Sequence, residues 1–237
     1  MSGLQKKYGL DIIYEDNHIV VVNKKPSQIV QGDKTGDVPM SDILKAYLKE
    51  KYNKPGNVYL GLVHRLDRPT SGIVIFGRTD KAASRLSKLF HDRDVAKKYW
   101  AVVQEAPPEE SGHLIHFLRK KEKQNKSYVV KEQAEGAKKA ELKYKLLGKS
   151  DRYYLLEVEL LSGRHHQIRC QLAHIGCPIK GDVKYGFSRA NKDLSIHLHA
   201  RSLSLVHPVK KEQMQYIAKP PIDPVWNYFA DTINDNL

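Results

Sequence analysis

Apolar and polar residues alternate along the chain in patterns typical of a mixed α/β protein. Short runs rich in β-branched residues predict strands, and apolar positions three to four residues apart predict helices. Two short strands are predicted at 11–23, around a turn at Asp16 and Asn17. Single strands are predicted at 98–104, 153–161, 195–199 and 202–206. Helices are predicted at 42–52 with Ser41 as the cap, from Asp80 to about 91, at 166–175, and at about 223–234. We therefore expect one α/β (α+β) domain over residues 1–237, with a large, mostly antiparallel mixed sheet flanked by helices.

Two apolar runs, residues 59–63 and 73–76, enclose the polar sequence HRLDRPTSG, which extends from His64 to Gly72. Because both runs are typical of strands, the polar segment is predicted to be a loop carried by a buried sheet. Asp67 lies close to Arg65 and Arg68, and a nearby positive charge favours the ionised form of a carboxyl group. An ionised carboxylate can act as nucleophile, base or electrostatic stabiliser. From these residues alone, a surface turn with a salt bridge is an equally simple interpretation.

Residues 105–150 differ from the rest because they are polar, rich in lysine and interrupted by proline and glycine. This pattern predicts hairpins that project from the core. Its most basic stretch is KKEKQNK, from Lys120 to Lys126. Two interpretations remain open for this basic region, namely a surface that contacts an RNA backbone and an ordinary solvated strand face.

Composition narrows the class of protein. The 237 residues include 41% hydrophobic residues, enough for a substantial core without crosslinks. The net charge of +13 favours a polyanionic partner, because cationic side chains displace counterions from phosphates, although a basic protein without such a partner remains possible. The two cysteines, Cys170 and Cys177, imply no disulfide framework, and no apolar segment has the length of a signal peptide or membrane span. We expect a cytoplasmic protein.

The segment HRLDRPTSG closely resembles the central motif of the RluA-type RNA pseudouridine synthases, HRLD followed by two variable residues and TSG. Four further segments resemble motifs of that family, in the family's order: AKKYWAVV at 96–103, GRHHQIR at 163–169, CPIKGDVKYG at 177–186 and HARSLSLVHP at 199–208. The resemblance covers about residues 11–210. Two positions depart from the family pattern, since Gln28 replaces the usual glycine of a K-P-x-G motif and Cys170 replaces a β-branched residue. Gln28 lacks the backbone freedom of glycine, so the turn there is expected to differ in shape.

The resemblance implies a pseudouridine-synthase fold with a central RNA-binding cleft, and three catalytic residues in it. Asp67 is implied as the nucleophile or stabiliser, whether it adds to the base, adds to the ribose C1′ or promotes elimination. Tyr99 is implied to stack on the extruded uracil and to assist proton transfer, while Arg169 is implied to pair with Asp67. From the residues alone, Tyr99 could equally be a core residue and Arg169 an exposed helix residue.

A second group of residues is expected to contact the RNA or the base. Arg65 is a candidate to fill the gap left by a flipped uridine, because a planar guanidinium can stack on neighbouring bases. Leu66 and Ile168 are expected to wall the pocket or to be plain core, and His64 and His166 to orient the active loop. The remaining candidates for RNA contact are Thr70, Arg164 and Lys180.

The resemblance also implies an enzyme that needs neither metal nor organic cofactor. The histidine spacings, such as His165-His166 and His197-x-His199, lack the compact ligand sets of zinc sites, so no metal is expected. Because the first motif begins within about two dozen residues of Met1, we expect no preceding S4-type RNA-binding domain. We expect a monomer.

Three functional hypotheses follow, and the first is favoured. It is an isomerase that converts specific uridines of structured ribosomal or transfer RNA to pseudouridine. The second is a non-catalytic RNA-binding or assembly protein with the same fold. The third, a carboxylate hydrolase acting on a sugar or nucleoside, normally requires two carboxylates, whereas HRLDRPTSG contains one.

Overall fold

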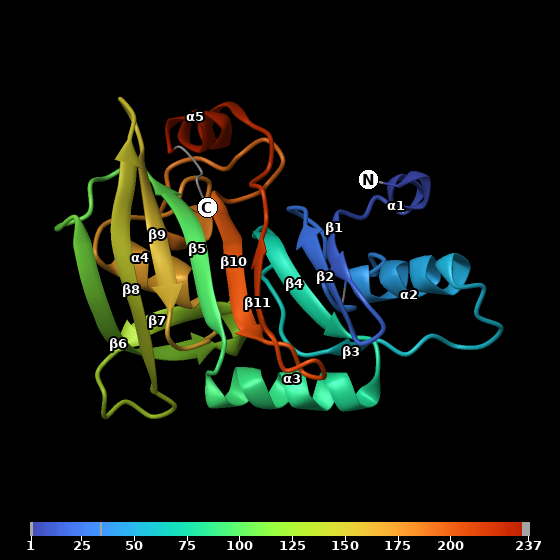
Figure 1. Cartoon of the computed structure of the whole chain (residues 1–237). Helices are drawn as coiled ribbons and strands as arrows, with labels where there is room; N and C mark the ends of the chain where they lie inside the picture. Colours follow the sequence, from blue (N-terminus) through green and yellow to red (C-terminus); the bar gives the residue numbers. More distant parts are fainter. Residues whose placement is uncertain (1, 34, 234–237) are drawn as a thin grey trace. The chain divides into compact units, whose positions relative to one another are not determined.

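The computed structural model describes residues 2–33 and 35–233, and these form two compact units (Figure 1). The first unit consists of Met1–Val95 and Arg201–Lys219, and the second of Ala96–Ala200 and Pro220–Leu237. Strand β10 (Leu198–Val206) therefore begins in the second unit and continues in the first. Both units combine antiparallel strands with a few helices, as the sequence predicts. That the whole chain acts as one domain remains a prediction.

The first unit is built on antiparallel strands that the hydrophobic pattern largely anticipates. Strand β1 (Ile12–Glu15) pairs with β2 (Ile19–Lys24), β2 pairs with β4 (Ser71–Gly77), and the two-residue β3 (Gly61–Leu62) also pairs with β4. Strand β10 pairs with β11 (Gln213–Ile217). The predicted strand at 59–63 is thus mostly irregular chain. Residues 202–206 are in a strand as predicted, but the predicted break is wrong, because residues 198–206 form one continuous strand that begins after 195.

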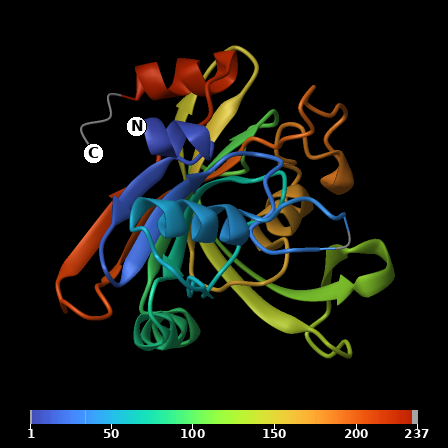
Figure 2. The same ribbon diagram turned by 90° about the vertical axis from the view of Figure 1, so that its right-hand side faces the viewer.

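Helices α2 (Met40–Lys51) and α3 (Asp80–Asp92) cover opposite faces of β2 and β4 and can be followed in Figure 2. Successive strand residues point to opposite faces, so two sets of side chains result. One set packs with Ala82 and Leu86 of α3, and the other packs with Leu44 and Leu48 of α2. The respective strand residues are Ile19, Val21, Ile73 and Ile75, and Val20, Val22, Val74 and Phe76.

The ends of these helices correct one prediction. Thr79 caps α3 because its side chain accepts a hydrogen bond from Ala82 N. Ser41, predicted as the cap of α2, lies inside that helix, which begins at Met40 after Pro39 and has no side-chain cap. A further short helix, α1 (Gly3–Lys7), was not predicted and begins with a capping box formed by Ser2 and Gln5.

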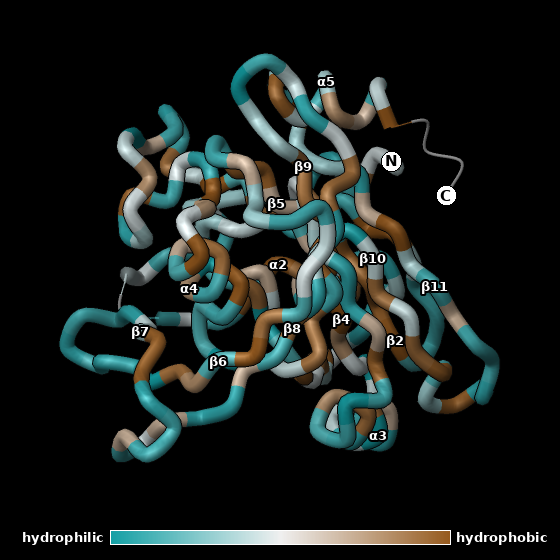
Figure 3. Tube along the Cα trace, turned by 90° about the vertical axis from the view of Figure 1, so that its left-hand side faces the viewer, coloured by the Kyte–Doolittle hydropathy of each residue, from teal (hydrophilic) through white to brown (hydrophobic). Residues whose placement is uncertain are grey.

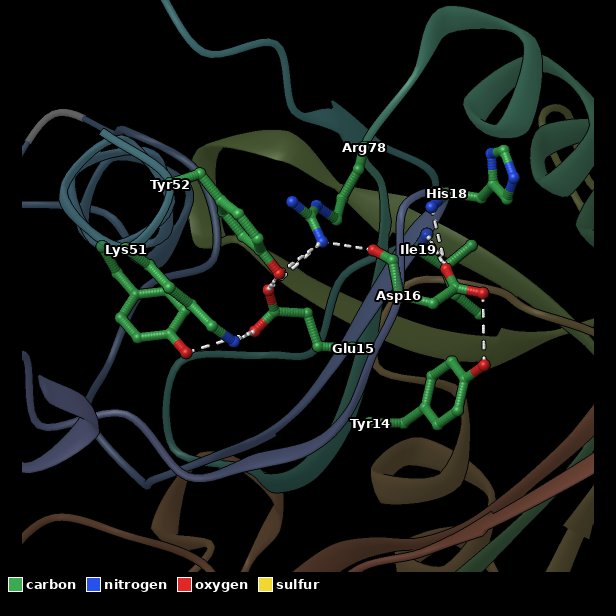
Figure 4. Close-up of polar contacts among 9 residues, drawn as sticks. Tyr14, Glu15, Asp16, His18, Ile19, Lys51, Tyr52 and Arg78 are labelled. Carbon is green, nitrogen blue, oxygen red and sulfur yellow. Dashed lines mark hydrogen bonds and ion pairs between the residues drawn. The ribbon is translucent and has the colours of Figure 1, made fainter. Parts of the chain in front are cut away.

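The turn between β1 and β2 is held by two adjacent carboxylates (Figure 4). Asp16 accepts hydrogen bonds from His18 N at 2.8 Å and Ile19 N at 2.9 Å, which fixes the turn predicted at this position. The side chain of Glu15 is 6% exposed and binds side chains of two segments, the end of α2 and the residue after β4. Its donors are Lys51 Nζ, Tyr52 OH, Tyr47 OH and Arg78 Nη1, at 2.8, 2.6, 3.2 and 3.2 Å.

The second unit is an antiparallel sheet in the order β5-β9-β8-β6-β7. Its strands are β5 (Ala96–Val103), β6 (Ser111–Lys121), β7 (Lys126–Val130), β8 (Lys138–Lys149) and β9 (Tyr154–Leu160). The predicted hairpins at 105–150 exist, but β8 pairs along β9 and contributes buried residues such as Leu142. These hairpins therefore extend the sheet instead of projecting from it. The connection between β6 and β7 is hydrophilic (Figure 3) and contains the one-turn helix η1 (Glu122–Gln124).

Two helices pack on this sheet. Helix α5 (Pro224–Thr232) corresponds to the predicted terminal helix, and its buried Trp226 and Phe229 contact a cluster that includes Trp100 and Leu155. Residue 234, the end of the predicted helix, lies outside the described residues. Helix α4 (Gln167–His174) ends before Gly176, which has φ +83°, and the buried Cys170 packs against Leu118 and Ala140. The one-turn helix η2 (Val183–Tyr185) places Tyr185 in the same cluster.

Candidate active site

The loop that carries Asp67 runs from β3 to the fully buried strand β4. His64 fixes the beginning of the loop, because its Nε2 accepts a hydrogen bond from Ile75 N at 3.1 Å. Its ring stacks on that of Phe90, with centroids 4.5 Å apart. At the other end, Thr70 is buried and its N–H donates to Asp67 O at 3.0 Å. A rigid strand and two local contacts thus define the backbone around Asp67.

The two arginines beside Asp67 are exposed. The guanidinium of Arg68 forms an ion pair with Asp37, which lies on the loop before α2. Leu66, between Arg65 and Asp67, packs partly buried against the apolar cluster under α2. The side chains of this loop therefore separate into a partly buried leucine and two exposed cations around Asp67.

A buried cation beside this loop was missed by sequence reasoning. Lys24, only 1% exposed, donates from Nζ to three backbone carbonyls: Lys25 O at 3.0 Å, Gln28 O at 2.9 Å and Arg68 O at 3.1 Å. Burial lowers the pKa of Lys24 to about 7, while the negative charge of Asp67 opposes this shift. Lys24 thus ties the turn at 25–28 to the loop that carries Asp67. The sequence contains no local signal for this role, because Lys24 lies between the polar residues Asn23 and Lys25.

The departure at Gln28 has a structural explanation. The residue of this turn with left-handed backbone is Ser27, with φ +67°, so position 28 does not require glycine. Gln28 Oε1 accepts a hydrogen bond from Lys25 N at 3.0 Å and closes the turn with its side chain. Ser27 N donates to Arg68 O at 3.0 Å, which adds a second link to the loop. Gln28 therefore closes the turn with a side chain that glycine lacks, and a shape different from the family's glycine turn remains a prediction.

The other two predicted catalytic residues belong to the second unit. Tyr99 lies on β5 opposite Val158 of β9 and is 9% exposed. Arg169 lies on α4 and is 4% exposed, so it is not an ordinary exposed helix residue. Every residue from Gln167 to Leu172 is buried, so this helix exposes no polar face over these positions. The helix is short and enclosed, and the side chains of Gln167 and Arg169 form their hydrogen bonds within the protein.

Arg169 is held by a buried carboxylate. Its Nε lies 2.6 Å from Asp182 Oδ2 and its Nη2 lies 2.9 Å from Asp182 Oδ1, a bidentate pair. Asp182 is 1% exposed and follows Gly181 in the segment CPIKGDVKYG. The ring of Tyr185 lies over the guanidinium, with its centroid 5.1 Å from Arg169 Cζ. The pairing of Arg169 with Asp67 remains a prediction.

The remaining candidates in the second unit have mostly local roles. His166 precedes α4 with φ +51°, and its Nδ1 lies 3.0 Å from Tyr185 OH. Arg164 Nε donates to Lys139 O at 2.9 Å, and Ile168 is buried. Lys180 Nζ donates to Asn191 Oδ1 at 2.8 Å, and burial lowers the pKa of this lysine. Lys180 and Arg164 are therefore anchored to the protein, and contact of either with RNA stays a prediction.

The basic stretch 120–126 forms the end of the β6–β7 hairpin. The ammonium groups of Lys121 and Lys126 lie 4.9 and 5.4 Å from the centroid of the Tyr128 ring. Lys184 Nζ donates to Asn125 O at 3.2 Å, so η2 contributes a further cation beside the hairpin end. This gathering of lysines around an aromatic ring fits a surface for a polyanion.

Within the described residues, no group of three or more histidine, cysteine or acidic side chains could hold a metal ion. His165 and His166 stack on each other with centroids 3.8 Å apart, and His197 Nε2 lies 3.1 Å from Asp223 Oδ2. Both cysteines are buried and carry free thiols. Among residues 2–33 and 35–233, no helix has the length and apolar character of a membrane span.

The chain is similar in sequence and in structure to known RNA pseudouridine synthases. A family model described as RNA pseudouridylate synthase matches residues 18–174. The chain is 30% identical to the tRNA pseudouridine synthase C of Vibrio parahaemolyticus over 92% of either protein. It is 32% identical to the ribosomal large subunit pseudouridine synthase C of Rickettsia prowazekii, over 92% of this chain and 71% of that protein. A solved structure of human RNA pseudouridylate synthase domain containing 4 matches with a TM-score of 0.78 and 26% identity, over 97% of this chain and 95% of that one.

Proposed function

This chain belongs to the RluA-type RNA pseudouridine synthases, and we propose that it converts specific uridines of ribosomal or transfer RNA to pseudouridine with Asp67 as the catalytic carboxylate. The chief support for the role of Asp67 is its position in HRLDRPTSG, on a loop supported by the buried strand β4. The relatives named above act on transfer RNA or ribosomal RNA, which motivates both substrate classes.

The reaction exchanges one bond of the base for another. The bond between N1 of the uracil and C1′ of the ribose breaks, a bond between C5 and C1′ forms, C5 loses its proton and N1 gains one. An ionised Asp67 would add to the base or to C1′, or would assist elimination at the ribose. In this proposal Arg169 pairs with Asp67 and orients it, and Tyr99 stacks on the detached uracil.

RNA binding requires additional groups. We propose that the exposed Arg65 occupies the gap left when the target uridine leaves its helix, because a guanidinium stacks on bases and binds phosphate. The net charge of +13 supports attraction of the RNA backbone. The lysines of the 120–126 hairpin end, and Arg164, Lys180, His166 and Thr70, are secondary candidates for contacts to RNA. We further propose that the enzyme acts as a monomer and without metal, so EDTA should leave turnover unchanged.

The test is release of tritium from RNA labelled at uridine C5, because the label leaves as the new carbon–carbon bond is completed. Wild type, Asp67→Ala and the matched control Asp42→Ala should be compared on separate pools of ribosomal and transfer RNA. Asp42 is an exposed carboxylate of the same unit, on α2. We expect release by wild type and Asp42→Ala and none by Asp67→Ala, with RNA binding retained by all three.

Two outcomes would contradict the proposal. Full turnover by Asp67→Ala would remove this carboxylate from the mechanism. Tight, salt-sensitive RNA binding by wild type without release from either pool would instead indicate a non-catalytic RNA-binding protein.

A further inference from the structure

The guanidinium of Arg169 is constrained from two directions by residues that the reaction itself does not use. Asp182 holds one edge through Nε and Nη2, and the ring of Tyr185 lies over its face. A planar group held along one edge and across one face can neither rotate nor slide. The contacts through Nε and Nη2 therefore also fix the direction in which the third nitrogen, Nη1, points.

Asp182 is itself firmly placed. Its backbone carbonyl accepts hydrogen bonds from Tyr185 N at 3.0 Å and Phe187 N at 3.1 Å, and its N–H donates to Ile179 O at 2.9 Å. The preceding Gly181 has φ +86°, and a Cβ there would lie 2.8 Å from Ser195 O. The chain therefore reaches Asp182 through a turn that only glycine accommodates.

Tyr185 is anchored by its hydroxyl group. The oxygen accepts a hydrogen bond from Ser127 N at 2.8 Å and lies 3.0 Å from Nδ1 of His166. Burial raises the pKa of Tyr185, so the hydroxyl keeps its proton and can donate it to His166. Strand β7 and the residue before α4 thus fix the ring that covers Arg169.

We propose that Asp182 and Tyr185 are positioning residues for the isomerisation. Asp182 fixes the guanidinium of Arg169 along one edge, and the ring of Tyr185 fixes it across one face. This inference rests on the proposed function, in which Arg169 orients the catalytic carboxylate. Neither residue touches the reacting atoms. Their effect is on the geometry of a catalytic group, where a displacement of about 1 Å can cost roughly a hundredfold in rate.

The decisive variant is Asp182→Asn, which preserves shape but replaces one acceptor oxygen by an NH2 group that cannot bind a guanidinium N–H. We expect kcat for tritium release to fall about a hundredfold, with KM for RNA within about twofold, because Asp182 is 1% exposed and is not itself proposed to touch RNA. Asp182→Glu keeps the carboxylate and should recover part of the loss. Asp223→Asn is the matched control, since it removes a different, half-buried carboxylate of the same unit, which pairs with His197; it should leave kcat unchanged.

A second pair of variants tests the ring without touching Asp182. Tyr185→Leu removes the ring and should lower kcat more than tenfold, whereas Tyr185→Phe keeps the ring and should lower it only a few-fold. This pair decides the question if Asp182→Asn fails to fold. All rates are normalised to folded protein, with melting temperatures recorded for each variant.

The outcomes separate this inference from the proposed function. If wild type releases tritium and Asp182→Asn matches it per folded molecule, or if Tyr185→Leu and Tyr185→Phe are equally active, the positioning role is wrong while the function stands. A loss of activity that merely follows the melting temperature would also overturn it, because a structural role would reduce the folded fraction and leave kcat intact. If wild type itself releases none, the proposed function falls and this inference falls with it.

Discussion

Lys24 in the first unit and Arg169 in the second are both buried cations, but the protein stabilises them in different ways. Lys24 is bound by three backbone carbonyls, whereas Arg169 is bound by the carboxylate of Asp182. Carbonyls satisfy the hydrogen bonds of an ammonium without cancelling its charge, and a carboxylate does both. Lys24 therefore links backbone segments and remains titratable. Arg169 instead forms an ion pair in which Asp182 sets the orientation of the guanidinium.

The largest effect should come from removing the cation that is paired with a carboxylate. Arg169→Met leaves Asp182 buried without its countercharge, which should reduce the free energy of unfolding by about 4 kcal/mol. Adding Asp182→Leu to this variant should recover most of the loss, because an apolar pair of similar volume avoids a buried charge. Urea denaturation of both proteins measures this, and equal stabilities of the single and double variants would contradict it.

Removing the carbonyl-bound cation should cost less. Lys24→Met leaves three carbonyl oxygens without their common donor, and we expect a loss of about 2 kcal/mol, since a carbonyl deprived of a partner in a loop can find water. The same denaturation experiment provides the comparison. A loss larger than that of Arg169→Met would mean that the loop around Asp67, and not the ion pair, is the more strongly constrained region.

Titration offers a sharper test of the contrast. The pKa of Lys24 falls from its ordinary value near 10.5 to about 7 in the native state, so between these values the unfolded chain binds a proton that the native protein does not. The stability of wild type relative to Lys24→Met should therefore rise as the pH increases from 7 to 9. Arg169 stays charged throughout, and so the stability difference between wild type and Arg169→Met should be flat over this range. Parallel curves for wild type and Lys24→Met would show that Lys24 keeps its proton.

The smallest effect concerns the turn that Lys24 spans. Gln28→Ala removes the acceptor for Lys25 N, a single partly exposed hydrogen bond, and should cost about 0.5 kcal/mol. Thermal unfolding with Lys88→Ala as an exposed surface control can resolve this. A change no larger than that of the control would mean that Lys24 alone defines the turn.

The sequence predicted those parts of the molecule that depend on periodic patterns. The strands on either side of Asp16 and the helix that starts at Asp80 agree with the structure, because alternating and helical spacings report which face is buried. The terminal helix with Trp226 and Phe229 is also correct through residue 232.

Features set by contacts between distant segments were not predictable in this way. Nothing local distinguishes Lys24 from Lys25, yet the first is buried and the second exposed, because the carbonyls that bind Lys24 include one from Arg68. The bond between Arg169 and Asp182 joins a helix to the turn after it, and the five motifs mark both residues without assigning them to each other. The Ser41 cap was wrong because Pro39 already ends the preceding chain in an extended conformation.

The discontinuity of the first unit has a consequence for how the chain is made. Leu203 and Tyr216, from strands β10 and β11, belong to the same apolar cluster as Ile19 and Ile73, but all of residues 96–200 must be synthesised between them. At ~5–20 residues per second, that interval is on the order of ten seconds. During this time the nascent amino-terminal strands present an incomplete apolar face. The second unit's sheet, whose strands β5 to β9 lie consecutively in the chain, can form before β10 and β11 are synthesised, whereas its helix α5 is synthesised last.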